Sequence, residues 1–146
     1  MKKEQYKNLV KARAPKAKAF NNAVKAFTVG GLICVIAQFL FELIKKTGIP
    51  EDKSYSLTTM IMIFIGTTLT AFGIYDKIGN FAGAGSIVPV TGFANSVAST
   101  AIEFKKEGLI TGTCTKMFVI AGPVIVYGVN TSMLIGILYF IWSYYG

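Results

Sequence analysis

Long uncharged and mainly apolar runs alternate with short charged clusters along the 146 residues of the chain. The uncharged runs cover residues 26–41, 54–75, 78–102 and 117–146. An apolar run of roughly 20 residues crosses the hydrocarbon core of a bilayer as a helix, whereas an amphipathic helix of a soluble domain carries charges on one face throughout. The pattern therefore predicts an all-α, polytopic membrane protein with about three full transmembrane helices and one further, irregular segment.

Two of the full spans are expected near the start of the chain. The first covers residues 26–44 and the second runs from about residue 54 to residue 74, with Ser54 or Ser56 as its N-cap. Between them the charged stretch 45–53 contains a Gly and a Pro, which are typical of a short loop outside the membrane.

The third full span lies within residues 117–146. An unbroken helix of that length would measure about 45 Å, which exceeds the roughly 30 Å of hydrocarbon. We therefore expect Gly122, Pro123 and Gly128 to break or kink it. The aromatic cluster at 139–145 is typical of side chains at the membrane interface.

The irregular segment is the uncharged run 78–102, because three glycines and a proline interrupt its middle part. An interior Gly costs about 0.5–1 kcal/mol and an interior Pro about 3 kcal/mol in a helix. Such backbone is tolerated at membrane depth only where protein buries it or where it lines a watery cavity. The segment either re-enters or makes a fourth crossing. The excess of Lys and Arg on cytoplasmic loops favours the re-entrant form, which leaves the lysines of loop 103–116 on the same side as the N-terminus.

Positive charge is concentrated in residues 1–25, which hold eight Lys or Arg and one acid, Glu4. We interpret this stretch as a basic cytoplasmic segment with a short helix near 3–13, and residues 26–146 as the membrane domain. The segment can rest on anionic lipid, and it lacks the motifs of a nucleic-acid partner.

Catalytic chemistry has few candidates. The chain has no His, and Cys34 and Cys114 each lie alone in or beside apolar runs. The common zinc ligand sets and the Ser-His-Asp and Cys-His arrangements are therefore missing. We expect no enzymatic activity, no catalytic residue, no metal site and no cofactor.

Four acidic residues are possible charge sites: Glu42, Asp76, Glu103 and Glu107. An ionisable group at the end of a span is often functional, although Glu42 can also reach the interface beside its neighbouring lysines. Glu103 and Glu107 are four residues apart and could hold a cation, but Ca²⁺ needs about six or more oxygens. Ion pairs with the lysines between them are the simpler interpretation.

The irregular segment offers the best site for an anion. If a half-helix begins after Pro89 with Thr91 as its N-cap, its free N–H groups would attract carboxylates. Packing of small residues in a bundle is the alternative role for the glycines. The residues that we expect to line a pathway are Gly83, Gly85, Ser86, Pro89, Thr91, Gly92 and Asn95.

Four motifs occur in a fixed order: Gly-Ile-Tyr-Asp-Lys at 73–77, Phe-Ala-Gly-Ala-Gly-Ser-Ile-Val-Pro-Val-Thr-Gly-Phe-Ala-Asn-Ser at 81–96, Ala-Ile-Glu-Phe-Lys-Lys-Glu-Gly at 101–108 and Lys-Met-Phe-Val-Ile-Ala-Gly-Pro-Val-Ile-Val-Tyr-Gly at 116–128. Together they resemble the SpoVA membrane proteins of spore-forming bacteria. The resemblance covers about residues 20–130.

This resemblance implies a channel or transport subunit in the inner membrane of the spore, with its N-terminus on the spore-core side. The complex moves dipicolinic acid with calcium into the forespore and releases it on germination. The implied partners are AE-type SpoVA membrane subunits, a soluble thiolase-like AD-type subunit and calcium dipicolinate, in a hetero-oligomer. A scaffold subunit that does not line the pathway is the alternative, and kinkable helices suggest gating by membrane tension.

Overall fold

The computed structural model describes Glu4 and residues 18–145, and the described chain is helical without strands. The short helix expected near 3–13 lies outside the described residues. Three helices are long and apolar enough to cross a membrane, at Ala19–Lys45, Glu51–Ala71 and Leu109–Tyr144. The predicted all-α membrane fold with three full spans is confirmed.

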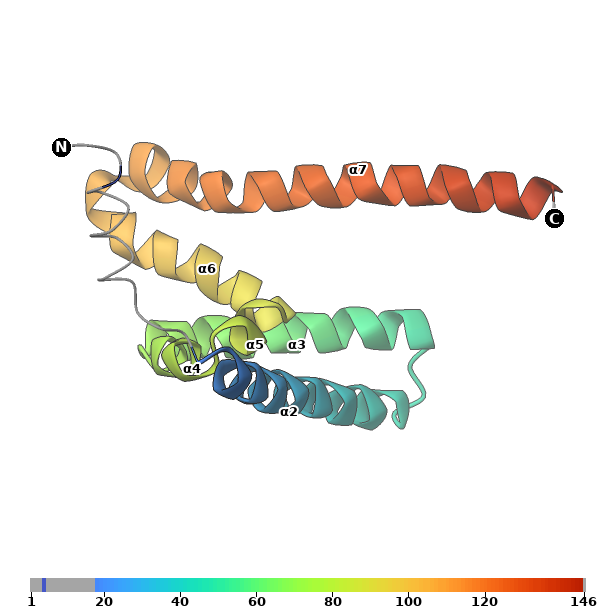
Figure 1. The fold of residues 1–146 in the computed structure, drawn as a ribbon, viewed down its shortest axis with the longest axis horizontal. Coiled ribbons are helices and arrows are strands. Elements are labelled where there is room, and N and C mark those ends of the chain that lie inside the picture. The colour runs from blue at the N-terminus through green and yellow to red at the C-terminus, as the bar shows by residue number, and fades with distance from the viewer. Residues whose placement is uncertain (1–3, 5–17, 146) are drawn as a thin grey trace.

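Helices α2 (Ala19–Lys45) and α3 (Glu51–Ala71) form an antiparallel pair joined by the predicted loop (Figure 1). Helix α2 begins earlier than expected, because its first turns carry exposed polar residues that need no burial in lipid. The prediction of a Ser54 or Ser56 cap was wrong: Pro50 occupies the N-cap position of α3. Proline suits a helix start because its missing N–H would have no partner there.

The buried face of α3 repeats at every fourth position: Ser54, Thr58, Met62, Gly66 and Thr70. Positions four apart share one side of a helix, so these residues form one narrow stripe along α3. A Cβ placed on Gly66 would lie 3.0 Å from the carbonyl oxygen of Thr91. Because Gly66 has no side chain at this point of the stripe, α3 can approach the backbone at Thr91 closely.

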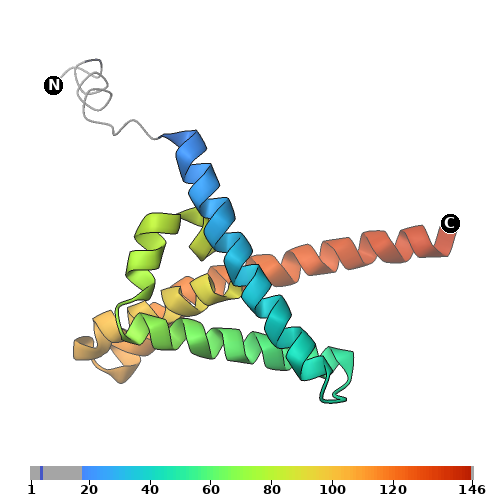
Figure 2. The ribbon, with the colours of Figure 1, turned by 90° about the horizontal axis from the view of Figure 1, so that it is seen from below.

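The irregular segment folds into three short helices, α4 (Tyr75–Ala82), α5 (Ala84–Ile87) and α6 (Val90–Glu103). The longest, α6, has 14 residues and measures about 21 Å, less than the roughly 30 Å of hydrocarbon. The segment leaves the C-terminal end of α3, and α6 returns beside α3 to that same end (Figures 1 and 2). This path has the re-entrant form, and we call α4–α6 the hairpin.

Gly83 and Pro89 mark the two turning points of the hairpin. Gly83 has a φ of 54°, a left-handed conformation that L side chains rarely adopt. Pro89 has extended backbone and stands at the N-cap position of α6, with no side-chain cap. The predicted N-cap at Thr91 was wrong, because the helix begins at Val90 and the Thr91 hydroxyl bonds elsewhere.

The chain reverses again between α6 and the last helix. A 3₁₀ turn at Phe104–Glu107 and a π-helical stretch at Leu109–Cys114 flank Gly108, which has a φ of 99°. Gly112 is buried against this turn: a Cβ there would lie 2.6 Å from the Phe104 carbonyl oxygen. Glycine at both positions makes the sharp reversal possible.

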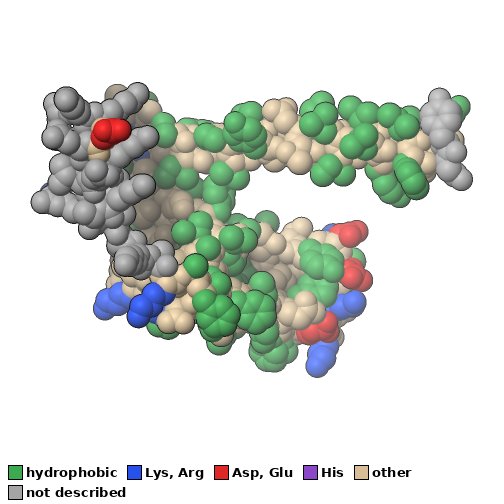
Figure 3. Space-filling view, viewed as in Figure 1, with side chains coloured by type: hydrophobic (Ala, Val, Ile, Leu, Met, Phe, Trp, Pro, Cys, Tyr) green, Lys and Arg blue, Asp and Glu red, His purple; other side chains and the backbone are tan. Residues whose placement is uncertain are grey.

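Helix α7 (Thr115–Tyr145) is continuous through Gly122, Pro123 and Gly128, so the predicted break was wrong. Its side chains are exposed at every described position from residue 123 to residue 144. A broad hollow separates it from the α2–α3 pair (Figure 3). With apolar side chains all round it, α7 meets either lipid or another subunit in a membrane.

Candidate functional site

Tyr75 holds the hairpin together from its buried position, where only 4% of its surface is exposed. Its hydroxyl oxygen lies 2.8 Å from the carbonyl oxygen of Ser86 and 2.9 Å from Oγ1 of Thr91. The carbonyl can only accept, so Tyr75 donates its single proton to Ser86 and accepts the proton of Thr91. One phenol thereby ties the start of α4 to α5 and α6.

Asn95 joins the hairpin to the second span. The Thr70 hydroxyl donates to Oδ1 of Asn95 at 2.7 Å, and it lies equally close to the carbonyl oxygen of Gly66 in its own helix. Asn95 lies one helical turn after Thr91 on α6, so the two residues face the same side of the hairpin. The contacts of Thr91 with Tyr75 and of Asn95 with Thr70 are thus both directed into the protein.

The central glycines of the hairpin are sites of close backbone contact. A Cβ on Gly85 would overlap the carbonyl group of Ala26 in α2, and one on Gly30 would lie 3.1 Å from the Gly85 carbonyl oxygen. A Cβ on Gly92 would overlap the carbonyl groups of Ser86 and Ile87. Gly85 and Gly92 therefore have a packing role. Gly83, by contrast, has open space around it.

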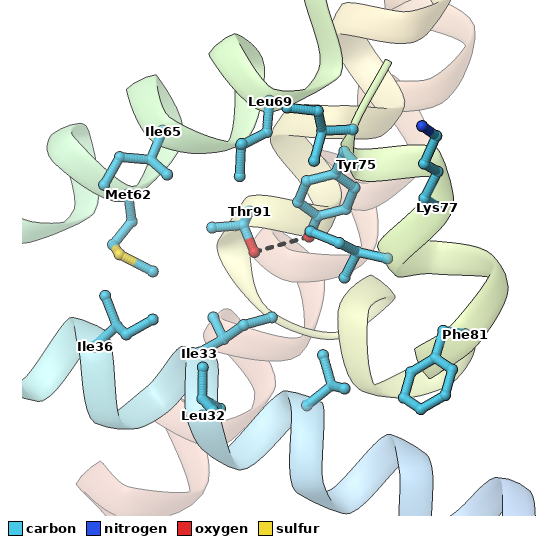
Figure 4. A pocket seen from close by; sticks show the side chains of 13 residues that line it. Leu32, Ile33, Ile36, Met62, Ile65, Leu69, Tyr75, Lys77, Phe81 and Thr91 are labelled. Carbon is cyan, nitrogen blue, oxygen red and sulfur yellow. Dashed lines mark hydrogen bonds between the residues drawn. The ribbon is translucent and has the colours of Figure 1, made fainter. Parts of the chain in front are cut away.

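An apolar cavity of about 520 Å³ lies between α2, α3 and α4 (Figure 4). Tyr75, Thr91 and Lys77 are among its lining residues, and the hydroxyls of Tyr75 and Thr91 are bonded to each other. Aliphatic walls offer nothing to an anion with several carboxylate oxygens. The cavity is thus unsuited to a small dianion. Its lining residues are Val29, Leu32, Ile33, Ile36, Met62, Ile65, Leu69, Ile74, Tyr75, Lys77, Ile78, Phe81 and Thr91.

A second cavity of about 370 Å³ has a more polar lining and lies between the start of α2 and the junction of α4 with α5. Asn22 and Asn80 contribute side-chain amides, which can donate to a carboxylate. Of the predicted pathway residues, Gly83 lines this cavity. Sequence reasoning missed both asparagines: Asn22 fell in the basic segment, and Asn80 was one uncharged residue among many.

The predicted pathway residues fall into four groups. Ser86, Thr91 and Gly92 gather around the Tyr75 hydroxyl, and Gly85 packs on α2. Asn95 faces α3, while Gly83 and Pro89 form the turns. Every buried side-chain nitrogen or oxygen among the described residues has a hydrogen-bond partner. The described chain by itself therefore presents no unpaired buried side chain to a ligand.

The four acidic candidates are all exposed and do not come together. Glu42 accepts a hydrogen bond from Gln38 at 3.0 Å. The expected ion pairs of Glu103 and Glu107 are absent from the described residues, whose one ion pair joins Lys45 and Glu51. No cluster of three or more potential metal ligands occurs within residues 18–145. The four carboxylates thus lie on the outside of the described fold.

Tyr75 was the main omission of the sequence analysis. It belongs to the Gly-Ile-Tyr-Asp-Lys motif, yet a tyrosine beside two charged residues at a span end is typical of an interfacial anchor. Its partners lie 11 and 16 residues later, on two other short helices, so no single helical face brings the three groups together. The bond depends on the turns at Gly83 and Pro89, so the folded hairpin was needed to find it.

Comparison with known proteins gives a consistent result. Residues 22–138 match the model of the SpoVAC/SpoVAEB sporulation membrane protein family. The chain is 52% identical over 139 residues to a protein of Bacillus subtilis (strain 168) named stage V sporulation protein AC, covering 94% of this chain and 93% of that protein. No solved structure matches. This chain belongs to the SpoVAC/SpoVAEB family of sporulation membrane proteins.

Proposed function

We propose that the chain is a subunit of an assembly in the inner spore membrane that moves dipicolinic acid with calcium, and that its hairpin borders the pathway. The observation that carries this proposal is the hairpin itself: helices of 8, 4 and 14 residues turn back among three long spans. Irregular backbone at that depth needs protein or a watery cavity around it. Membership of a sporulation membrane family supplies the biological setting.

The orientation follows from charge. Lys77, Lys105 and Lys116 belong to segments at the end of the molecule to which α3 and α6 return. The other end carries Lys45, Lys46 and Lys53, whereas α2 begins at the first end with Lys18 and Lys25, so Lys and Arg are in excess at the first end. The bias of Lys and Arg toward the cytoplasm places the first end, and the basic N-terminal segment, on the spore-core side.

A pathway for a planar dianion needs more than one copy of this fold. The polar lining at Asn22 and Asn80 offers amide donors for carboxylates, but it opens on the outside of the described chain. The side chains of α7 from residue 123 to residue 143 are exposed, and most of them are apolar. We therefore propose a hetero-oligomer with AE-type membrane subunits and the AD-type soluble subunit, in which neighbours complete the pathway.

Cysteine scanning of residues 81–95 tests this proposal. The background carries Cys34→Ser and Cys114→Ala, because both native thiols are free. Ala84, Ile87 and Val88 are the most informative positions, since all three are exposed on the hairpin. A charged thiol reagent should modify at least one of them in germinating spores and slow release of dipicolinic acid. Val35→Cys on α2 is the matched exposed control, and it should have no effect on release.

The scaffold role is the second candidate, and the close backbone contacts at Gly85 and Gly92 favour it. Val88→Asn separates the two roles, because Val88 is 85% exposed and packs little within the chain. If the hairpin borders the pathway, this change should alter the rate of release at an unchanged level of assembled protein. An unchanged rate, combined with unreactive cysteines at every scanned position, would assign the pathway to another subunit.

A further inference from the structure

We propose that the apolar cavity between α2, α3 and α4 binds one acyl chain of an anionic phospholipid whose phosphate lies beside Lys77. This site is separate from the proposed dipicolinate pathway. Its volume of about 520 Å³ falls in the roughly 300–1,000 Å³ range of small-molecule sites. The shape of the cavity, its apolar lining and the lysines near one end support this assignment.

The cavity runs along the helices, as an acyl chain does in a bilayer. On α2 its lining extends from Val29 to Ile36, and on α3 from Met62 to Leu69. Each stretch covers eight residues, and its ends are about 10 Å apart along the helix. Figure 4 shows Lys77 at one end of the cavity and Met62 and Ile36 at the other. The long direction therefore leads from a helix end toward the middle of the bundle.

The lining is open to the surroundings rather than sealed inside the protein. Leu32 is 62% exposed and Phe81 is 58% exposed, although both line the cavity. In a membrane this opening faces hydrocarbon, so a lipid chain can enter from the side. Because the Tyr75 and Thr91 hydroxyls are bonded to each other, the floor presents no unpaired hydroxyl to an apolar chain.

The positive charge of Lys77 at the end of the cavity favours a lipid with an anionic headgroup. Lys77 forms no ion pair within the described part of the chain, and it is the one charged residue among those that line the cavity, with its amine directed away from the apolar walls (Figure 4). A second amine lies close by, since Nζ of Lys25 is 4.7 Å from the centroid of the Phe81 ring. Lysines near a membrane surface attract anionic lipids. An apolar cavity with two amines near one end suits a lipid with an anionic headgroup, such as phosphatidylglycerol.

Native mass spectrometry of the full-length protein, with added phosphatidylglycerol or phosphatidylcholine of the same chain length, tests the site. We expect one phosphatidylglycerol to be retained about fivefold more strongly than phosphatidylcholine. Lys77→Gln should remove that preference, whereas Lys105→Gln, at the same end of the molecule, should preserve it. Ile33→Phe fills the cavity and should weaken retention of both lipids. Val35→Phe, on the exposed side of the same helix, is its control.

Three outcomes would overturn the proposal. Equal retention of the two lipids by the unmodified protein would remove the role of charge. An equal effect of Lys77→Gln and Lys105→Gln would indicate diffuse attraction to the surface rather than a site. A dimer that Ile33→Phe dissociates, with lipid retention unchanged, would show that a second copy of the chain fills the cavity. Thermal unfolding of Ile33→Phe with and without phosphatidylglycerol distinguishes loss of the site from loss of the fold.

Discussion

Thr70 and Asn95 are joined by a hydrogen bond of 2.7 Å that links the C-terminal part of α3 to the middle of α6. Hydrogen bonds between membrane helices contribute about 0.6 kcal/mol on average and up to about 1.7 kcal/mol. We predict a coupling free energy in this range from a double-mutant cycle with Thr70→Val and Asn95→Ala, measured by denaturant unfolding in detergent.

Thr67→Val is the matched control for this cycle, because the Thr67 hydroxyl bonds to the Ile63 and Phe64 carbonyls of its own helix. It should show no coupling with Asn95→Ala. Equal coupling for Thr67 and Thr70 would mean that the bond between α3 and α6 contributes nothing specific.

Tyr75→Phe removes the hydroxyl that connects α4 to α5 and α6 while preserving the ring. The change leaves the Ser86 carbonyl and the Thr91 hydroxyl without their shared partner, and an unsatisfied buried polar group costs about 1–3 kcal/mol. We expect a fall in thermal stability of that size. Tyr55→Phe should change stability much less, because the Tyr55 hydroxyl is exposed and lies 3.4 Å from Glu51. A stable Tyr75→Phe protein would argue against Tyr75 as the anchor of the hairpin.

Gly85→Ala should destabilise the protein far more than Gly31→Ala. The added methyl group at Gly85 meets the backbone of α2 at Ala26, which cannot move aside as a flexible side chain would. Overpacking typically costs about 1–3 kcal/mol. At Gly31 nothing lies within 4 Å of the new Cβ, and Ala favours helix by up to about 1 kcal/mol. Folded yields and thermal melts of the two variants in the same detergent compare them directly, and equal melting temperatures would contradict the contact.

Trp142, the single tryptophan of the chain, reports the depth of the end of α7 without any substitution. It lies 26 residues after Lys116, or about 39 Å along the helix, close to the roughly 40–45 Å of a bilayer with its headgroups. We predict that lipids brominated near the glycerol quench its fluorescence more than lipids brominated near the chain end. Stronger quenching by the deep label would place this part of α7 inside the hydrocarbon.

The long helices were predictable because the length of an uncharged, apolar run indicates whether a helix can cross the membrane. Helices α2, α3 and α7 each correspond to an uncharged run, and the loop before α3 follows from its Gly and Pro. The ends of the helices were harder to predict. A serine at position 54 or 56 is a typical N-cap, but α3 begins earlier, after Pro50. The Ser54 hydroxyl instead bonds to the carbonyl oxygens of Ile49 and Pro50.

The candidate site was predictable only in outline. Glycines at 85 and 92 indicated close approach, yet the sequence contains no information on which backbone each would meet. Those partners, Ala26 and Ser86, lie on other elements of the chain. Pro123 removes one backbone hydrogen bond, and α7 continues through it. The contact of Gly85 with Ala26 joins residues far apart in the sequence, whereas that of Gly92 with Ser86 depends on the turn at Pro89.

The hydroxyl groups of α3 have a mechanical consequence. The other Ser and Thr side chains of this helix donate to a carbonyl of the preceding turn, whereas the Thr70 hydroxyl donates to Asn95 of α6. On the side of α2, α3 also has the exposed Lys45–Glu51 ion pair and the stacking of Tyr55 on Phe41. A shear of α3 against the hairpin would therefore break one side-chain hydrogen bond between these two elements, that of Thr70 with Asn95.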